Sequence, residues 1–126
     1  MNLNSILIGS EDPDRLVAYY SKLFGEPTWN DGGYVGWLLG QGALTLGPHD
    51  EVKGKNPQPG RILWNLETPD VPAEFERLRG AGGTVVREPY HPGGGDEEWE
   101  GWVATFEDPD GNYFQLMSPM GPPESS

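Results

Sequence analysis

The chain has 126 residues, a formal net charge of −12 and no cysteine. A chain of this length predicts one domain with a core of its own. The lack of cysteine excludes disulfide bonds, thiolate zinc sites and a cysteine nucleophile. The acidic charge argues against a nucleic-acid partner, because phosphates are bound by basic surfaces, and it favours cations among charged ligands. Neither a signal-peptide pattern nor an apolar run of about 18 residues is present, so we expect a cytoplasmic protein with no membrane partner.

The first part of the chain predicts a strand, a helix and three further strands. Residues 3–9 read as an apolar strand, and Asp12 followed by Pro13 is typical of a capped helix start. Gly25 is expected to end this helix. Its buried face is predicted from apolar residues spaced at i, i+3, i+4 and i+7, which are Leu16, Tyr19, Tyr20 and Leu23. Short strands are then expected at residues 27–30, 34–39 and 43–46.

The same order of elements is predicted again after a polar, proline- and glycine-rich stretch. Residues 47–60 indicate a mobile loop, within which residues 50–60 form the linker between two repeats. A strand at residues 61–67 is followed by a helix that begins at Asp70. The buried face of that helix is expected to contain Val71, Phe75 and Leu78. A strand at residues 84–87 completes this part.

The last two strands form a predicted β-hairpin. Residues 102–106 and 113–117 are apolar and aromatic runs, and the turn Asp108-Pro109-Asp110-Gly111-Asn112 lies between them. Proline presets φ, glycine accepts positive φ, and aspartate and asparagine bond their own backbone in such turns. Strand alternation places Tyr113 and Gln115 on one face and Phe114 on the other.

The two halves form an internal repeat. A shift of 56 positions places Ile6-Leu7 on Ile62-Leu63 and Pro13-Asp14 on Pro69-Asp70. The sequence therefore predicts a single α+β domain of two βαβββ repeats. The repeats span residues 3–49 and 61–119 of a domain at 1–119, before a disordered tail at 120–126.

The repeat also predicts where a ligand binds. One helix covers only one face of a four-stranded sheet, so the uncovered concave faces must pair with each other. We expect this pairing to form a curved, mixed β-sheet cleft with the helices on the outside. The paired halves belong either to one chain or to two chains of a homodimer.

The hairpin carries a motif of known proteins, Phe106-x-Asp-Pro-Asp-Gly-Asn-x-x-x-Leu116. Together with the two βαβββ repeats, it resembles the vicinal oxygen chelate superfamily over residues 3–119. Members of this superfamily include glyoxalase I, extradiol dioxygenases, fosfomycin-resistance enzymes and bleomycin-resistance proteins. The fold carries both enzymes and binding proteins, so the resemblance alone assigns no activity.

The resemblance implies a divalent metal held by the first and last strands of each half. The four corresponding positions are Ser5, Thr45, Arg61 and Gln115. Neutral serine, threonine and glutamine side chains are weak ligands, and a guanidinium repels a cation. We therefore predict no metal, no cofactor and no catalytic residue of the family type.

Aromatic residues suggest a binding role. Trp64 is assigned to the core by strand alternation. Trp37 and Trp102 are predicted either to contact a ligand or to serve packing or a dimer interface. Trp99, in an acidic loop, is predicted either to close over a flat ligand or to anchor its own loop. Arg61, Asn65, Gln115 and Tyr113 are predicted to face the cleft as well.

The sequence thus favours a metal-free, homodimeric protein that sequesters an aromatic small molecule, cationic ones included, in antibiotic resistance or self-resistance. The first alternative is an enzyme: a lyase resembling glyoxalase, a thiol transferase or a dioxygenase with an atypical metal site. A metal-independent cyclase or isomerase using Arg61 and Gln115 belongs to the same alternative. The second alternative is a regulatory or chaperone-like subunit.

Overall fold

The computed structural model describes residues 1–92 and 101–119. The chain divides into two compact units. Unit 1 contains Met1–Pro57 together with Asp108–Gly111, and unit 2 contains Gln58–Glu107 and the chain from Asn112 onward. The tail predicted at residues 120–126 lies outside the described residues. No helix in the described part of the chain is long and apolar enough to cross a membrane.

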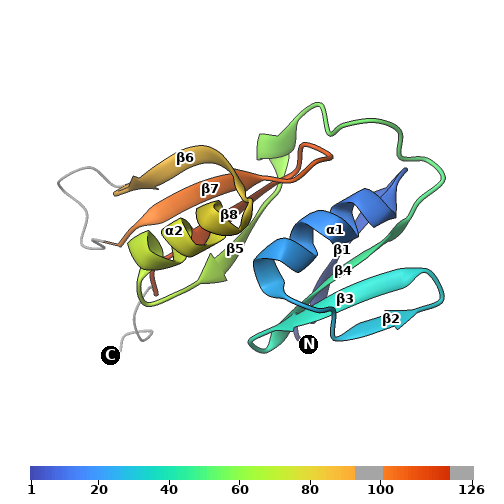
Figure 1. The fold of residues 1–126 in the computed structure, drawn as a ribbon, viewed down its shortest axis with the longest axis horizontal. Helices are drawn as coiled ribbons and strands as arrows, with labels where there is room; N and C mark the ends of the chain where they lie inside the picture. The colour runs from blue at the N-terminus through green and yellow to red at the C-terminus, as the bar shows by residue number, and fades with distance from the viewer. Residues whose placement is uncertain (93–100, 120–126) are drawn as a thin grey trace. The chain divides into compact units, whose positions relative to one another are not determined.

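Unit 1 is the first βαβββ repeat (Figure 1). Its four strands have the order β1-β4-β3-β2, with β1 parallel to β4 and the other pairs antiparallel. Helix α1 lies across one face of this sheet. The elements are β1 (Ser5–Ser10), α1 (Pro13–Phe24), β2 (Trp29–Asp31), β3 (Tyr34–Leu39) and β4 (Gly42–Pro48).

Helix α1 buries the face that the spacing predicts. Its buried residues are Leu16, Tyr19, Tyr20 and Leu23. The helix ends before Gly25, whose φ of 87° is accessible to glycine without steric cost. Asp12 precedes the helix, but the prediction that its side chain caps it is wrong. The backbone N–H of Arg15 donates instead to the backbone carbonyl oxygen of Asp12, at 3.2 Å, and so needs no side-chain acceptor.

Unit 2 repeats this topology with the strand order β5-β8-β7-β6. Helix α2 covers one face of the sheet and buries Val71, Phe75 and Leu78, as predicted. Its start is capped by Asp70, whose carboxylate accepts the Ala73 N–H at 3.1 Å. The elements are η1 (Pro59–Arg61), β5 (Leu63–Glu67), α2 (Val71–Ala81), β6 (Thr84–Tyr90), β7 (Val103–Glu107) and β8 (Tyr113–Met117).

The core of unit 2 is aromatic and lies between the sheet and α2. Trp64 is 8% exposed and stacks on Phe114 with ring centroids 5.0 Å apart, which confirms its assignment to the core. Phe106 stacks on the other side of Phe114 and also contacts Phe75 of α2. Trp64, Phe114 and Phe106 come from β5, β8 and β7, so strand alternation defines the face of the sheet that lies beneath the helix.

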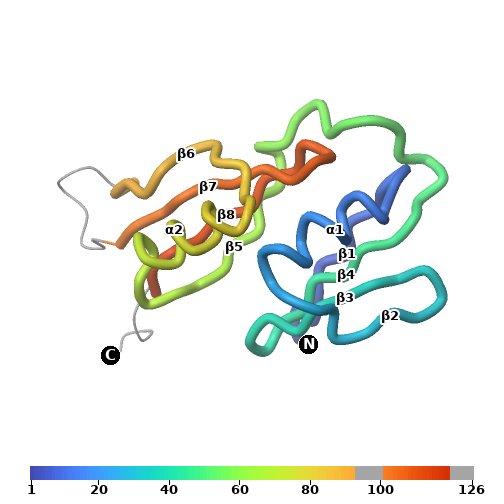
Figure 2. The backbone as a smooth tube through the Cα atoms, in the orientation of Figure 1, coloured from blue at the N-terminus to red at the C-terminus, as the bar shows by residue number. Residues whose placement is uncertain are grey.

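The connection from β4 to β5, traced in green in Figure 2, makes specific hydrogen bonds. The Gly54 N–H donates to the Glu11 carboxylate at 3.0 Å. The Asn56 N–H donates to the Asp110 carbonyl oxygen at 2.8 Å. The strand predicted at residues 61–67 begins two residues later, at Leu63, because Pro59–Arg61 forms a short 3₁₀ turn.

The turn between β7 and β8 provides a buried polar cluster of unit 1. Asp108 and Asp110 are 3% and 4% exposed. The Tyr20 hydroxyl donates to Asp108 Oδ2 at 2.7 Å, while Ser10 Oγ and Arg15 Nη2 donate to the Asp110 carboxylate at 2.5 and 2.6 Å. Burial, followed by the negative charge of Asp108, raises the pKa of the Tyr20 phenol well above its usual value. Tyr20 therefore remains a neutral hydrogen-bond donor.

Candidate functional site

The sheet of unit 2 has a second face, opposite α2, which we term the open face because no described helix covers it. A polar row crosses this face, and Thr105 in the row is only 5% exposed. The register pairs Asn65 with Gln115, Gln115 with Thr105, and Thr105 with Arg87. Paired residues on neighbouring strands project from the same face, so one hydrogen-bonding side chain comes from each of the four strands. Gln115 Nε2 donates to Thr105 Oγ1 at 3.1 Å, which fixes the amide in the middle of this row.

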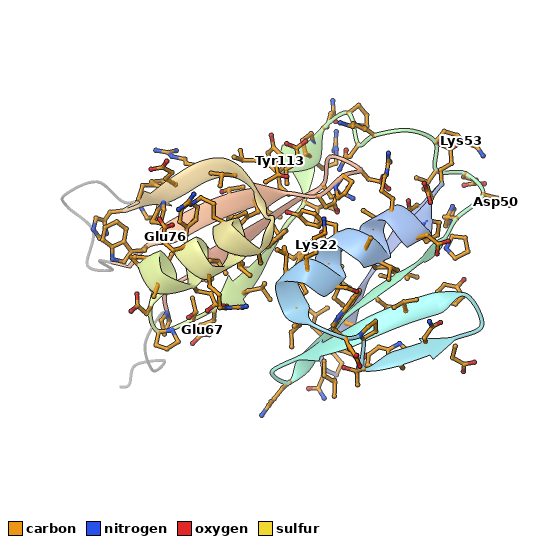
Figure 3. All side chains as sticks on the ribbon, in the orientation of Figure 1. Lys22, Asp50, Lys53, Glu67, Glu76 and Tyr113 are labelled. Carbon is orange, nitrogen blue, oxygen red and sulfur yellow. The ribbon has the colours of Figure 1, made fainter. Side chains whose placement is uncertain are left out.

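A second row, with Tyr113 at its centre, lies beside the polar row. Tyr113 pairs with Leu63 of β5 on one side and with Glu107 of β7 on the other. Side chains of directly opposite residues start about 5 Å apart, so Glu107 lies within reach of the Tyr113 ring. Figure 3 labels Tyr113 and Glu67 toward opposite ends of this sheet. The open face of unit 2 therefore has an aromatic ring with an apolar neighbour and an acidic neighbour.

Unit 1 also has an open face, and it is largely apolar. Leu7 and Leu38 are 60% and 59% exposed. The Trp29 ring lies over Gly36, where an added Cβ would be 2.2 Å from the indole. The Tyr34 ring covers Gly47 in the same way, again at 2.2 Å. The two glycines therefore let aromatic rings lie flat on the sheet.

Trp37 does not belong to either open face. It is 2% exposed, and its indole Nε1 donates to the Gly25 carbonyl oxygen at 2.9 Å. Its ring packs against Phe24 and Tyr20 of α1, with centroids 6.4 and 6.3 Å away. The ligand contact predicted for Trp37 does not fit this position beneath the helix, whereas the packing alternative does.

Of the other two tryptophans predicted to contact a ligand, the structure describes Trp102. Trp102 immediately precedes β7 and is half-buried. Its ring contacts the His91 ring with centroids 4.0 Å apart, and its backbone N–H donates to Ser118 Oγ at 2.8 Å. Trp99 lies outside the described residues. Trp102 therefore packs at the end of the hairpin, away from the row of Tyr113.

Arg61 also departs from the predicted site. It lies at the end of the 3₁₀ turn, before β5 begins, and its side chain is exposed. Its guanidinium donates to Gln58 Oε1, from Nη2 at 2.6 Å and from Nε at 3.2 Å. Proline and glycine in this turn prevent the strand from extending back to residue 61. Asn65, Tyr113 and Gln115 are thus the predicted residues that share one open face.

The four positions that the resemblance implies for a metal do not suit one here. Ser5 and Thr45 lie on the strands of unit 1, and Gln115 presents an amide already bonded to Thr105. Arg61 is bonded to Gln58 outside the strand. Among residues 1–92 and 101–119, no three His, Cys, Asp or Glu side chains group closely enough to hold an ion. The donor set is neutral or cationic, which a divalent metal binds weakly.

This donor set predicts weak metal binding. Calorimetric titration of chelator-treated protein with Mn²⁺, Ni²⁺ and Zn²⁺ is expected to show no one-to-one binding tighter than about 10 µM. The Gln115→Glu variant should behave in the same way, because a single carboxylate still lacks the other ligands. Tight one-to-one binding by the unmodified protein would contradict this interpretation.

Comparisons with known proteins agree with this fold. The chain matches the glyoxalase-like domain over residues 5–117. An uncharacterized protein of Mycolicibacterium smegmatis is 27% identical over 115 residues, which cover 91% of each chain. A glyoxalase-related enzyme from Fulvimarina pelagi has a TM-score of 0.70 and 21% identity, over 98% of this chain and 95% of that one.

A glyoxalase/bleomycin resistance protein/dioxygenase family enzyme from Burkholderia phytofirmans PsJN has a TM-score of 0.68 and 18% identity, over 94% of this chain and 98% of that one. At these identities the solved structures show a common fold and no common activity. The domain match covers both repeats and the hairpin motif. The chain therefore belongs to the glyoxalase-like domain family.

Proposed function

We propose that this protein binds an aromatic small molecule, cationic ones included, and sequesters it without chemical change, as in antibiotic resistance or self-resistance. The observation that supports this proposal is the open face of unit 2. There, Tyr113 lies beside Leu63 and Glu107 and next to the polar row that contains Gln115. The donor set at the family's metal positions, which is unsuited to a metal, favours binding over metal-dependent catalysis.

The chemistry of this face suits a flat ring with polar substituents. A ring stacked on Tyr113 gains about 0.5–1.5 kcal/mol beyond the apolar area that it buries. The Gln115 amide is held by Thr105 and so loses little freedom when it bonds a ligand. Glu107 adds an attraction for positive charge next to the ring, in a protein whose net charge is −12.

Three naphthalene probes with different substituents test this proposal. Chelator-treated protein is titrated calorimetrically with 2-naphthylmethylammonium, which is cationic, and with 2-naphthamide, which is neutral. We expect Tyr113→Ala to weaken both probes about tenfold, or 1.4 kcal/mol, because both stack on the ring. Glu107→Gln should weaken only the cation, to about the affinity of the amide. The third probe, 2-naphthoate, shows how a negative charge on the same ring changes the affinity.

The control for the charge change is Glu26→Gln, at an exposed position outside the open faces. It removes one negative charge from the protein but none from the face, so the cation should bind as it does to the unmodified protein. Equal binding by Tyr113→Ala and the unmodified protein would contradict the site. Chemical conversion of a bound ligand, detected by mass spectrometry after its release, would contradict sequestration.

A further inference from the structure

Arg87 gives the open face of unit 2 a cationic group that stacks on an aromatic ring. Its guanidinium carbon lies 3.4 Å from the centroid of the Tyr90 ring. The register pairs Arg87 with Thr105 and Tyr90 with Val103, so both side chains project from the open face. The Tyr90 ring covers one flat side of the guanidinium, and the N–H groups on its edge remain able to donate.

The other four arginines bond elsewhere. Arg15 pairs with Asp110, Arg77 with Glu74 and Arg79 with Glu76, and Arg61 bonds the Gln58 amide. Within the described part of the chain, Arg87 has the Tyr90 ring in place of an acidic partner. Among the described residues, Arg61 and Arg87 are the arginines without a carboxylate partner, and Arg87 is the one that lies on the open face. Its N–H groups can therefore bond an oxyanion from outside the chain.

The register relates Arg87 to the ligand site. Arg87 belongs to the polar row with Thr105 and Gln115, whereas Glu107 and Tyr113 belong to the neighbouring row. Residues two apart on a strand lie about 7 Å apart along it. The strand order β5-β8-β7-β6 puts Glu107 of β7 between Tyr113 of β8 and Arg87 of β6. A ring stacked on Tyr113 would therefore reach Glu107 and then Arg87 with two polar groups carried on the same side of the ring.

We propose that the ligand of this face is a zwitterionic aromatic compound, whose carboxylate binds Arg87 and whose ammonium group lies beside Glu107. A carboxylate matches the planar guanidinium with two parallel hydrogen bonds, which a point charge such as lysine cannot reproduce. This inference rests on the proposed function, because it assigns the second polar group of the same ligand. It adds Arg87 as the residue that selects for an anion at one end of an otherwise acidic site.

The test compares probes that share one ring system. Chelator-treated protein is titrated with 2-naphthoate and with neutral 2-naphthamide, which differ in charge at one position. We expect the carboxylate to bind at least about fivefold more tightly, although the net charge of −12 opposes any anion. The zwitterion 3-(2-naphthyl)alanine, which carries its ammonium and carboxylate groups on the same side of the ring, should bind more tightly than either.

Two variants assign this preference to Arg87. Arg87→Gln should lower the affinity for 2-naphthoate to about that for the amide, and Arg87→Lys should restore only part of the difference. Arg79→Gln, which removes the same charge from an exposed position on α2, should leave the advantage within about twofold of its original value. If Arg87→Gln and Arg79→Gln lower the advantage of 2-naphthoate over the amide equally, the assignment is overturned and the preference is a general effect of charge.

The outcomes also separate this inference from the proposed function. If 2-naphthamide binds and Tyr113→Ala weakens it, while 2-naphthoate has no advantage, the inference is overturned and the aromatic site stands. In that case, Arg87 serves only to pack on Tyr90. If none of the naphthalene probes binds up to about 10 mM, near −3 kcal/mol, both the site and the inference are overturned.

Discussion

Replacing Trp37 by alanine is expected to lower the free energy of unfolding by about 3–5 kcal/mol, the usual cost of removing a buried large aromatic side chain. Trp37 is 2% exposed, contacts Phe24 and Tyr20 of α1, and donates its indole N–H to Gly25 at 2.9 Å. The variant therefore loses both the packing of α1 on the sheet and a hydrogen bond at the end of the helix. Urea unfolding followed by circular dichroism measures the change.

Trp29→Ala is the matched control for this prediction. Trp29 is on the neighbouring strand β2, but its ring lies over Gly36 on the open face and is only half-buried. We expect it to cost less than half as much as Trp37→Ala. The milder Trp37→Phe should bind the naphthalene probes as the unmodified protein does. Weaker probe binding by a folded Trp37→Phe variant would restore the ligand contact that the sequence first predicted.

Periodicity predicted the helices and sheets well because burial decides them. The spacing of Leu16, Tyr20 and Leu23 leaves one possible buried face for α1. Alternation likewise placed Trp64 beneath α2 and Tyr113 with Gln115 on the opposite face. In each case one face is clearly apolar, and a shift by one residue would expose it.

The sequence placed Trp37 poorly because strand β3 is apolar on both faces. Val35 and Trp37 project toward α1, while Tyr34 and Leu38 project from the open face. Alternation divides such a strand into two sets but does not reveal which set the helix covers.

Arg87 was missed for a different reason. The register between β6 and β7 shifts on both sides of Arg87, so its face depends on irregularities that no periodic pattern predicts. The predicted strand also ended at residue 87, whereas β6 continues to Tyr90, the residue on which Arg87 stacks.

The turn between β7 and β8 shows a third limit. Its composition predicted local hydrogen bonds, and the Asp110 N–H does donate to Asp108 Oδ1 at 2.9 Å. The partners of the two carboxylates, however, are Ser10, Arg15 and Tyr20, which lie 88 to 100 positions earlier in the chain. Local turn chemistry carries no information about such partners. The hairpin motif therefore contributes to the core of unit 1 as well as forming a turn.

Asp108→Ala is expected to destabilise the protein by about 2–4 kcal/mol, because it removes the acceptor of two buried hydrogen bonds. Asp108 accepts from the Tyr20 hydroxyl at 2.7 Å and from the Asp110 N–H at 2.9 Å. Tyr20 is fully buried in unit 1, so without this acceptor the free-energy cost of removing its hydroxyl from water is only partly compensated. Urea unfolding followed by tryptophan fluorescence measures the loss.

A control and a double variant assign this cost to the Tyr20–Asp108 bond. Asp50→Ala removes a carboxylate with a side chain that is 99% exposed, and it should change stability by less than about 0.5 kcal/mol. Tyr20→Phe combined with Asp108→Ala should cost less than the sum of the single changes, since each removes the same bond. Additive costs would show that the two residues act independently. A loss in Asp108→Ala no larger than in Asp50→Ala would mean that the buried carboxylate contributes nothing to unit 1. The double variant matters most, because strong coupling would tie a motif near the end of the chain to the stability of its first helix.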